Sequence, residues 1–129
     1  MMQVSNDPEK TMTKRVLIVG DDKDTLEELT YLSHKLKLQV FNSLGAIPVE
    51  EVRMLAPDVV LMDCYLFDAS GADLCLKIKF SPFTRHIPVV MFSDKSGGER
   101  LAQKCRADAY LHKPFDLGDL LAQVNELVC

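Results

Sequence analysis

Short apolar runs alternate with amphipathic segments along most of the chain. Three runs contain no polar residue: Val16-Leu17-Ile18-Val19, Val59-Val60-Leu61-Met62 and Val89-Val90-Met91-Phe92. Such runs are typical of parallel strands that are buried on both faces of a sheet. Shorter strands are expected at 38–41 and 109–111. The pattern therefore predicts five strands.

Apolar residues at helical spacing separate these runs. In the first helix, expected at 25–37, leucines recur at positions 26, 29, 32 and 36, and Asp24 followed by Glu27 indicates a capped start. Asp116 is expected to cap the last helix, whose apolar stripe runs to residue 128. Shorter helices are predicted at 49–55, from Ser70 and Gly71 towards residue 82, and at 99–105.

The alternation of strands and helices predicts one α/β domain over residues 15–129. Its expected architecture is a doubly wound, five-stranded parallel sheet with right-handed crossovers and helices on both faces. Residues 1–14 are polar and contain the breaker Asn6-Asp7-Pro8, so they are expected to form a flexible leader.

The composition fits an ordinary globular domain, with 129 residues of which 47% are hydrophobic and 26% charged. The formal net charge of −4 argues against direct nucleic-acid binding, which requires basic patches. No apolar stretch reaches the roughly 18 residues that span a membrane, so we expect a cytoplasmic protein with no membrane partner. The four cysteines lie far apart without C-x-x-C spacing, and reduced thiols are expected.

Polar residues stand at the ends of four predicted strands. They are Asp21 and Asp22 after the first, Asp63 at the third, Ser93 at the fourth and Lys113 after the fifth. The carboxyl ends of parallel strands meet at one edge, so these side chains should converge. Crowded carboxylates repel one another unless a cation neutralises them, and their oxygens suit Mg²⁺. The set predicts a magnesium site where one carboxylate attacks phosphorus while the lysine and the serine hold phosphoryl oxygens.

Four segments in order carry a resemblance to a known family. They are Val16 to Asp22, Leu61-Met62-Asp63 with Gly71 eight residues on, Val89 to Ser93, and Tyr110-Leu111-His112-Lys113-Pro114-Phe115. From about Arg15 to its end, the chain resembles the receiver domain of two-component response regulators, the CheY-like superfamily. The resemblance implies a flavodoxin-like sheet with strand order 2-1-3-4-5.

The resemblance also implies a role for each site residue. Asp63 would accept a phosphoryl group from a sensor histidine kinase or a histidine phosphotransfer protein. Asp21, with the backbone carbonyl of Tyr65, would ligate Mg²⁺, and Lys113 and Ser93 would hold the phosphoryl group. The Lys113–Pro114 peptide bond would be cis.

Ser93 and Tyr110 would act as switch residues in such a domain. Their movement would alter the face built by the helix at 99–105, the strand at 109–111 and the last helix. That face would contact a downstream protein target or support a homodimer. Because the chain ends directly after the last helix, the output is expected to pass through a partner, unless the sequence is a domain of a longer protein.

Three positions depart from the family pattern. Gly20 stands where the family has the first acid of its acidic pair, so the pair is either Asp21 alone or Asp21 with Asp22. Phe67 stands in place of a proline, and Arg106 in place of a glycine. Tyr65, two residues after Asp63, is expected to screen the phosphorylated site from water.

Two other functions stay open at this stage. Gly20 favours a pseudo-receiver, an interaction domain that works without phosphorylation. A phosphatase with an aspartyl nucleophile would need a second acid two residues after Asp63, where Tyr65 stands. The leading hypothesis is a phosphorylation-switched signalling module, which is not an enzyme beyond catalysing its own phosphorylation and dephosphorylation.

Overall fold

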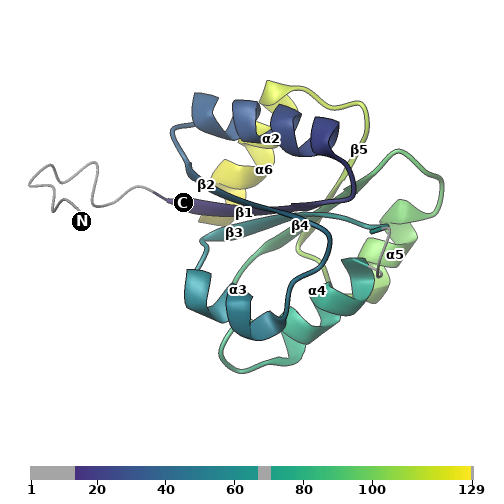
Figure 1. Ribbon diagram of the computed structural model, residues 1–129. Coiled ribbons are helices and arrows are strands. Elements are labelled where there is room, and N and C mark those ends of the chain that lie inside the picture. Colours follow the sequence, from purple (N-terminus) through teal and green to yellow (C-terminus); the bar gives the residue numbers. More distant parts are fainter. Residues whose placement is uncertain (1–13, 67–70, 129) are drawn as a thin grey trace, which may run out of the picture.

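The five predicted strands form one parallel sheet (Figure 1). The computed structural model describes residues 14–66 and 71–128. The strands lie in the order β2-β1-β3-β4-β5, as the resemblance implied. Their bounds are β1 Arg15–Gly20, β2 Gln39–Leu44, β3 Val59–Asp63, β4 Val89–Ser93 and β5 Ala109–His112.

In the part of the chain that the structure describes, four helices connect the strands and a fifth, α6, follows β5, and together they cover both faces of the sheet. Helices α2 and α6 lie on one face, and α3, α4 and α5 lie on the other (Figure 1). Their bounds are α2 Lys23–Lys35, α3 Val49–Leu55, α4 Gly71–Phe80, α5 Gly98–Lys104 and α6 Leu117–Val128. The doubly wound architecture predicted from the sequence is confirmed.

The predicted cap of α2 was wrong by two residues. Asp22, not Asp24, is the N-cap, with extended backbone dihedrals and a side chain that accepts the Thr25 N–H. Asp24 lies within the first helical turn, where a carboxylate still interacts favourably with the helix dipole. At the last helix, the predicted cap Asp116 accepts the N–H of Asp119, and Asp119 in turn accepts the N–H of Asp116.

Each central strand sends alternate side chains to the two faces. Val16 and Ile18 of β1 pack in the cluster beneath α2 and α6, while Leu17 and Val19 pack in the cluster beneath α3, α4 and α5. All residues of β3 and β4 are buried. A sheet buried on both faces explains why these strands read as continuous apolar runs.

The register aligns the strand ends that matter for chemistry. Asp63 of β3 pairs with Phe92, and Ser93 of β4 pairs with His112. The carboxyl ends of the strands therefore form one edge of the sheet, the carboxyl edge, and their starts form the opposite amino edge.

Two aspartates at the amino edge bind the starts of neighbouring strands. Asp58 accepts the N–H of Arg15 at 2.7 Å, and Asp108 accepts the N–H of Val89 at 2.7 Å. Each aspartate also donates its own N–H to the carbonyl of the same partner. Lys79 adds an ion pair to Asp108 at 2.6 Å and a hydrogen bond to the Ile87 carbonyl at 2.7 Å.

Some predictions fall on residues outside those described. They are residues 1–13 of the expected leader, Phe67, Ser70 and Cys129. The other three cysteines, Cys64, Cys75 and Cys105, are buried and free. Within the described ranges, no helix combines the length and apolar character that crossing a membrane requires.

Candidate functional site

A small polar cavity lies at the carboxyl edge, with a volume of about 160 Å³. It collects side chains from the ends of β1, β3, β4 and β5 and from the loops that follow them. The lining residues are Asp21, Asp22, Asp63, Tyr65, Ser93, Asp94, Lys95 and Lys113. All predicted site residues except Tyr110 thus line one cavity.

Asp63 is the most buried carboxylate of this cavity, with 8% of its surface exposed. Its Oδ1 accepts the backbone N–H of Tyr65 at 3.0 Å, which fixes the orientation of the carboxylate. Burial raises the pKa of Asp63 to about 6, and the neighbouring charge of Asp21 adds to the rise. Lys113 pulls the pKa in the other direction. The ionised form of Asp63 is therefore costly until a cation approaches.

The two acids after β1 differ in what they bind. Asp22 accepts the Thr25 N–H at 2.7 Å and the Thr25 hydroxyl at 3.0 Å, and these bonds lower its pKa. The pKa of Asp21 is raised by burial and by Asp22, while a hydrogen bond with Asp63 lowers it. Asp22 is thus committed to capping α2, and Asp21 shares the cavity with Asp63. Of the two acids, Asp21 is the better placed for a metal.

Lys113 reaches the cavity from the end of β5, and its peptide bond to Pro114 is cis, as the resemblance implied. Its Nζ donates to the Thr25 hydroxyl at 2.9 Å and lies 5.3 Å from the centroid of the Phe92 ring. Thr25 is 6% exposed and joins Lys113 to Asp22. Thr25 was not predicted as a site residue. Its signal was the spacing of three residues from Asp22, which matches a helix cap.

Ser93 lies at the end of β4 and is 3% exposed. Its Oγ accepts the N–H of Lys95 at 2.9 Å, so the hydroxyl proton can point into the cavity. The Lys95 ammonium lies 5.0 Å from the centroid of the Tyr65 ring. This lysine and this tyrosine stand together at the rim, each two residues beyond a buried side chain of the site.

Tyr110 is placed behind Ser93 rather than in the cavity. Its hydroxyl donates to the Ser93 carbonyl at 3.3 Å and lies 2.8 Å from Nδ1 of His112. The tyrosine hydroxyl has a single proton, which it donates to the Ser93 carbonyl. The contact with His112 is then a hydrogen bond in which a protonated Nδ1 donates to the tyrosine oxygen. Tyr110 is therefore held inward against β4 by its two neighbours.

Gly98, the first residue of α5, makes room for this arrangement. A Cβ at this position would lie 2.7 Å from the Tyr110 hydroxyl and 2.8 Å from Cβ of Ser93. Side-chain atoms do not tolerate such approaches without displacement. The need for glycine at position 98 was not predicted, because in the sequence this residue is indistinguishable from a turn glycine.

Gly20, the departure from the family pattern, sits against α2. A Cβ at position 20 would lie 3.1 Å from Cδ2 of Leu26, a residue that is only 8% exposed. The Leu26 side chain therefore occupies space that the missing acid would need, and the cavity has one carboxylate fewer than the family pattern provides.

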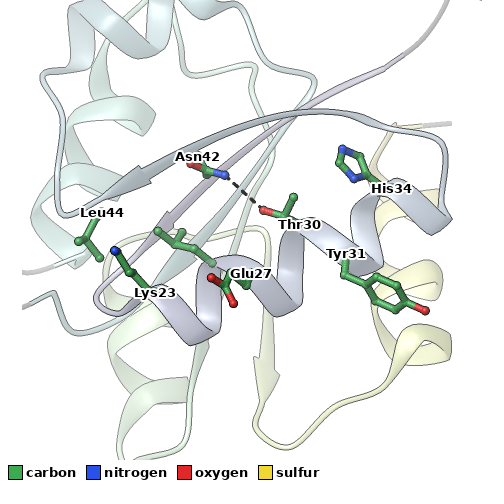
Figure 2. A pocket seen from close by; sticks show the side chains of 8 residues that line it. Lys23, Glu27, Thr30, Tyr31, His34, Asn42 and Leu44 are labelled. Atoms are coloured by element: carbon green, nitrogen blue, oxygen red, sulfur yellow. Dashed lines mark hydrogen bonds between the residues drawn. The ribbon is translucent and has the colours of Figure 1, made fainter.

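A larger hollow, with a volume of about 590 Å³, lies between α2 and the edge strand β2 (Figure 2). Its polar side chains come from that one helix and strand, and the Asn42 amide donates to the Thr30 hydroxyl at 3.3 Å. It contains none of the predicted site residues. The convergence of charged groups from four strand ends, rather than size, identifies the smaller cavity as the candidate site.

The donor set of the smaller cavity fits a small, hard cation. Mg²⁺ prefers one or two carboxylates with several waters, and Asp21 and Asp63 offer two carboxylates close enough for each to shift the pKa of the other. Among the described residues, no three His, Cys, Asp or Glu side chains form a ready cage for a metal. Such a cage would suit Zn²⁺ or Ca²⁺ better than an ion that keeps most of its water.

Comparisons with known proteins identify the family and the fold. The family model described as response regulator receiver domain matches residues 16–125. The DNA-binding response regulator MtrA of Mycobacterium tuberculosis is 32% identical over 89% of this chain and 50% of its own length. The response regulator PleD of Caulobacter vibrioides is 31% identical over 90% of this chain and 26% of its own length. The chain thus spans half or less of these curated relatives.

Solved structures share the fold. The receiver domain of the sensor histidine kinase PA1611 from Pseudomonas aeruginosa, which has a magnesium ion coordinated in its active-site cleft, superposes with a TM-score of 0.83 at 20% identity, covering 90% of this chain and 98% of that one. The chemotaxis response regulator CheY4 of Vibrio cholerae superposes with a TM-score of 0.80 at 16% identity, covering 90% and 99%. With the family match over most of its length, the chain belongs to the receiver domains of two-component response regulators.

Proposed function

We propose that this receiver domain is a phosphorylation switch in which Asp63 is the phosphoryl acceptor. The observation that carries the proposal is the placement of Asp63, buried beside Asp21 and within the electrostatic influence of Lys113, in a cavity that also contains the Ser93 side chain. A carboxylate whose pKa is raised by burial and by a like charge is a candidate for chemistry.

The reaction proposed is transfer from phosphohistidine. A carboxylate oxygen of Asp63 attacks phosphorus, the P–N bond breaks, and its electron pair returns to the imidazole nitrogen of the donor. Lys113 stabilises the negative charge on the transferred group, after exchanging its hydrogen bond with Thr25 for a phosphoryl oxygen. Ser93 donates its hydroxyl proton to another phosphoryl oxygen, while its Oγ still accepts the N–H of Lys95.

A divalent cation belongs to this proposal. Asp21, Asp63 and the backbone carbonyl of Tyr65 would hold Mg²⁺, which supplies charge neutralisation at the carboxylates and at the phosphoryl oxygens. Asp22 contributes mainly by capping α2, since both of its oxygens already accept hydrogen bonds from Thr25. The acidic pair of the site is therefore reduced to Asp21 and the acceptor itself.

The readout is proposed to pass through Tyr110. Its hydroxyl is bonded to the Ser93 carbonyl, so a movement of Ser93 towards a phosphoryl group changes the position of the ring. The affected face is built by α5, β5 and α6, and it would contact a downstream protein or a second copy of the chain. The phosphoryl donor would be a sensor histidine kinase or a histidine phosphotransfer protein.

Beryllofluoride, a mimic of the phosphoryl group, tests the acceptor site. In the presence of Mg²⁺ it should bind the wild-type protein and shift the amide NMR signals of Asp63, Ser93 and Tyr110. Asp63→Ala should show none of these shifts. Incubation with the small donor acetyl phosphate and Mg²⁺, followed by mass spectrometry, should add one phosphoryl group to the wild type and none to the variant.

Two outcomes of these experiments would contradict the proposal. Absence of binding at millimolar Mg²⁺, with a folded protein, would remove the switch and leave the phosphorylation-independent interaction domain. Shifts that persist unchanged in Asp63→Ala would place beryllofluoride elsewhere and contradict the assignment of the acceptor.

A further inference from the structure

A surface of exposed apolar side chains lies at the amino edge, opposite the phosphoryl-acceptor cavity. Phe80 ends α4 and is 63% exposed, and Phe83 in the following turn is 56% exposed. Met54, near the end of α3, is 83% exposed. Large aromatic and Met side chains gathered in solvent are typical of protein interaction sites.

An arginine stacks on each of the two phenylalanine rings. The guanidinium carbon of Arg53 lies 3.7 Å from the centroid of Phe83, and that of Arg106 lies 5.0 Å from the centroid of Phe80. Helix α4 packs against both α3 and α5 (Figure 1). Arg53 lies in the last turn of α3, and Arg106 follows the C-cap of α5. We call these five residues, Arg53, Met54, Phe80, Phe83 and Arg106, the arginine–aromatic surface.

The backbone at Arg106 has a positive φ, as it has at Lys37 and Ala56 at the ends of two other helices. Its φ of +64° lies in the left-handed region, where a glycine is most at ease and a side chain is disfavoured. Arg106 follows the C-cap of α5 and is itself exposed, so burial does not explain why a long side chain stands there. Its contact with the Phe80 ring is the feature that the side chain adds.

The charge around this surface is positive although the chain as a whole carries −4. The exposed side chains of Lys77, Arg85 and Lys104 come from the same ends of α4 and α5 and from the loop after Phe83. Of the nearby acids, Asp108 pairs with Lys79, while Glu50 and Glu51 are exposed in the first turn of α3, so the positive side chains of the surface and its surroundings still outnumber the unpaired acids. A partner that complements this surface must be acidic.

We propose that the arginine–aromatic surface docks an acidic segment of a partner protein that carries Leu, Phe or other apolar side chains between its carboxylates. Stacking uses the flat face of each guanidinium, and the N–H groups at its edge form paired hydrogen bonds with carboxylates. The apolar side chains of the segment cover the exposed rings, as aromatic and arginine anchors do in protein interfaces.

This docking is independent of the phosphorylation switch. The ten residues of α4 separate the acceptor loop from Phe80 by about 15 Å along the helix axis. The surface also shares no residue with the face built by α5, β5 and α6, although Arg106 lies close to the end of α5. The partner would therefore be held whether or not Asp63 is phosphorylated.

Selection from a phage-displayed library of random short peptides tests the proposal. The wild-type protein is the bait, and the double variant Arg53→Glu/Arg106→Glu is used for counter-selection. The peptides retained should combine Asp or Glu with Leu, Phe, Trp or Met. If no peptide distinguishes the two baits, or if those that do lack acidic residues, the proposal is wrong.

Single variants measure the contribution of each stack with a labelled peptide from that selection. Arg53→Glu and Phe83→Ser should each weaken binding roughly tenfold or more, whereas Arg100→Glu, an exposed charge reversal on α5 outside the surface, should leave binding unchanged. Arg106→Gly is the sharpest variant, because it removes the strained side chain without threatening the fold. Its thermal midpoint should be equal to or higher than that of the wild type while binding falls.

Two further measurements distinguish peptide docking at this surface from binding at the switch face and from binding to a membrane. Beryllofluoride with Mg²⁺ should leave the peptide affinity within about twofold, whatever it does at Asp63. Sedimentation with phosphatidylglycerol vesicles should pull down little protein. Stronger, Arg53-dependent binding to vesicles than to peptide would overturn the proposal in favour of a lipid surface, and NMR shifts from the peptide that map away from residues 80–83 would also overturn it.

Discussion

Aspartates stand at both edges of this sheet, and they behave in opposite ways. At the amino edge, Asp58 and Asp108 each accept a backbone N–H from the start of a neighbouring strand. At the carboxyl edge, Asp21 and Asp63 crowd each other, and the pKa of each is raised. The same residue type binds the backbone at one end of the strands and has a raised pKa at the other.

The direction of the peptide chain explains the difference. Parallel strands present unpaired N–H groups where they begin and unpaired carbonyl groups where they end. A carboxylate at the amino edge finds donors in the backbone, whereas one at the carboxyl edge faces acceptors. It must obtain its positive partners from lysines, from the N–H groups of loops such as that of Tyr65, or from a cation. Uncompensated negative charge at the carboxyl edge is what a cation such as Mg²⁺ can relieve.

The largest expected effect comes from Asp63→Asn. Transfer of a phosphoryl group from acetyl phosphate should be lost completely, because the amide oxygen is not a nucleophile towards phosphorus. In Mg²⁺-free buffer at pH 7 the same variant should unfold at higher urea than the wild type, with a gain of about 2 kcal/mol after allowance for solvent screening. A variant that is equally stable or less stable would contradict the strained charge inferred for this edge.

The pH dependence follows from the raised pKa of Asp63. Folding favours the protonated carboxyl, so the stability due to this group is fully present below its ordinary pKa of 3.8 and is lost as the pH rises through about 6. The difference between Asp63→Asn and the wild type should therefore vanish near pH 4 and be complete above pH 6. Urea unfolding at several pH values measures this, and millimolar Mg²⁺ at pH 7 should narrow the difference.

Gly98→Ala tests how tightly the carboxyl edge is packed. The added methyl group meets the Tyr110 hydroxyl and Ser93, and thermal unfolding should reveal a loss of about 2 kcal/mol. In a Tyr110→Phe background the loss should be smaller, since one of the two contacts is gone. Gly118→Ala in α6 is the matched control, because its Cβ approaches only the flexible Asp116 carboxylate. Equal effects at the two glycines would refute the special role of Gly98.

Asp108→Asn is the amino-edge counterpart of Asp63→Asn. The amide still accepts the Val89 N–H, but Lys79, whose side chain is 10% exposed, loses its counterion. We expect a loss of about 1 kcal/mol in urea unfolding at pH 7, reduced by the carbonyls that also bind Lys79. A higher free energy of unfolding for Asp63→Asn together with a lower one for Asp108→Asn would support the contrast between the two edges. A change in the same direction for both variants would contradict it.

The smallest expected effect concerns Tyr65. Its ring, with the Lys95 ammonium 5.0 Å from its centroid, stands at the rim of the cavity where water must enter. Tyr65→Asn should shorten the half-life of the phosphorylated protein several-fold, which corresponds to about 1 kcal/mol in the barrier. Loss of radiolabelled phosphate over time measures it, with Tyr31→Asn, far from the cavity, as the control. An unchanged or longer half-life would contradict the screening role.

Much of this arrangement was predictable because a buried parallel strand has a clear signature in a sequence. The apolar runs of β1, β3 and β4 and the polar residue at each end located Asp63 and Ser93 from the sequence alone. Strand β2 was predicted too short because it lies at the edge, where Asn42 and Ser43 are tolerated.

The errors arose where two residues compete for one role or where partners lie far apart in sequence. Asp22 and Asp24 both suit a helix cap, and the hydroxyl of Thr25 decides between them. The contact of Thr25 with Lys113 spans 88 positions, and no local pattern reports it. The requirement for glycine at 98 is set by Tyr110, which belongs to a different strand.

The contact between Gly20 and Leu26 constrains the order in which this sequence can change. An acid introduced at position 20 contacts the Leu26 side chain, so Leu26 must shift, or be replaced by a smaller residue, before the acid fits. A smaller residue 26, arriving first, leaves a gap beneath α2. The two positions are therefore coupled, because the side chain at position 26 sets how much room a side chain at position 20 has.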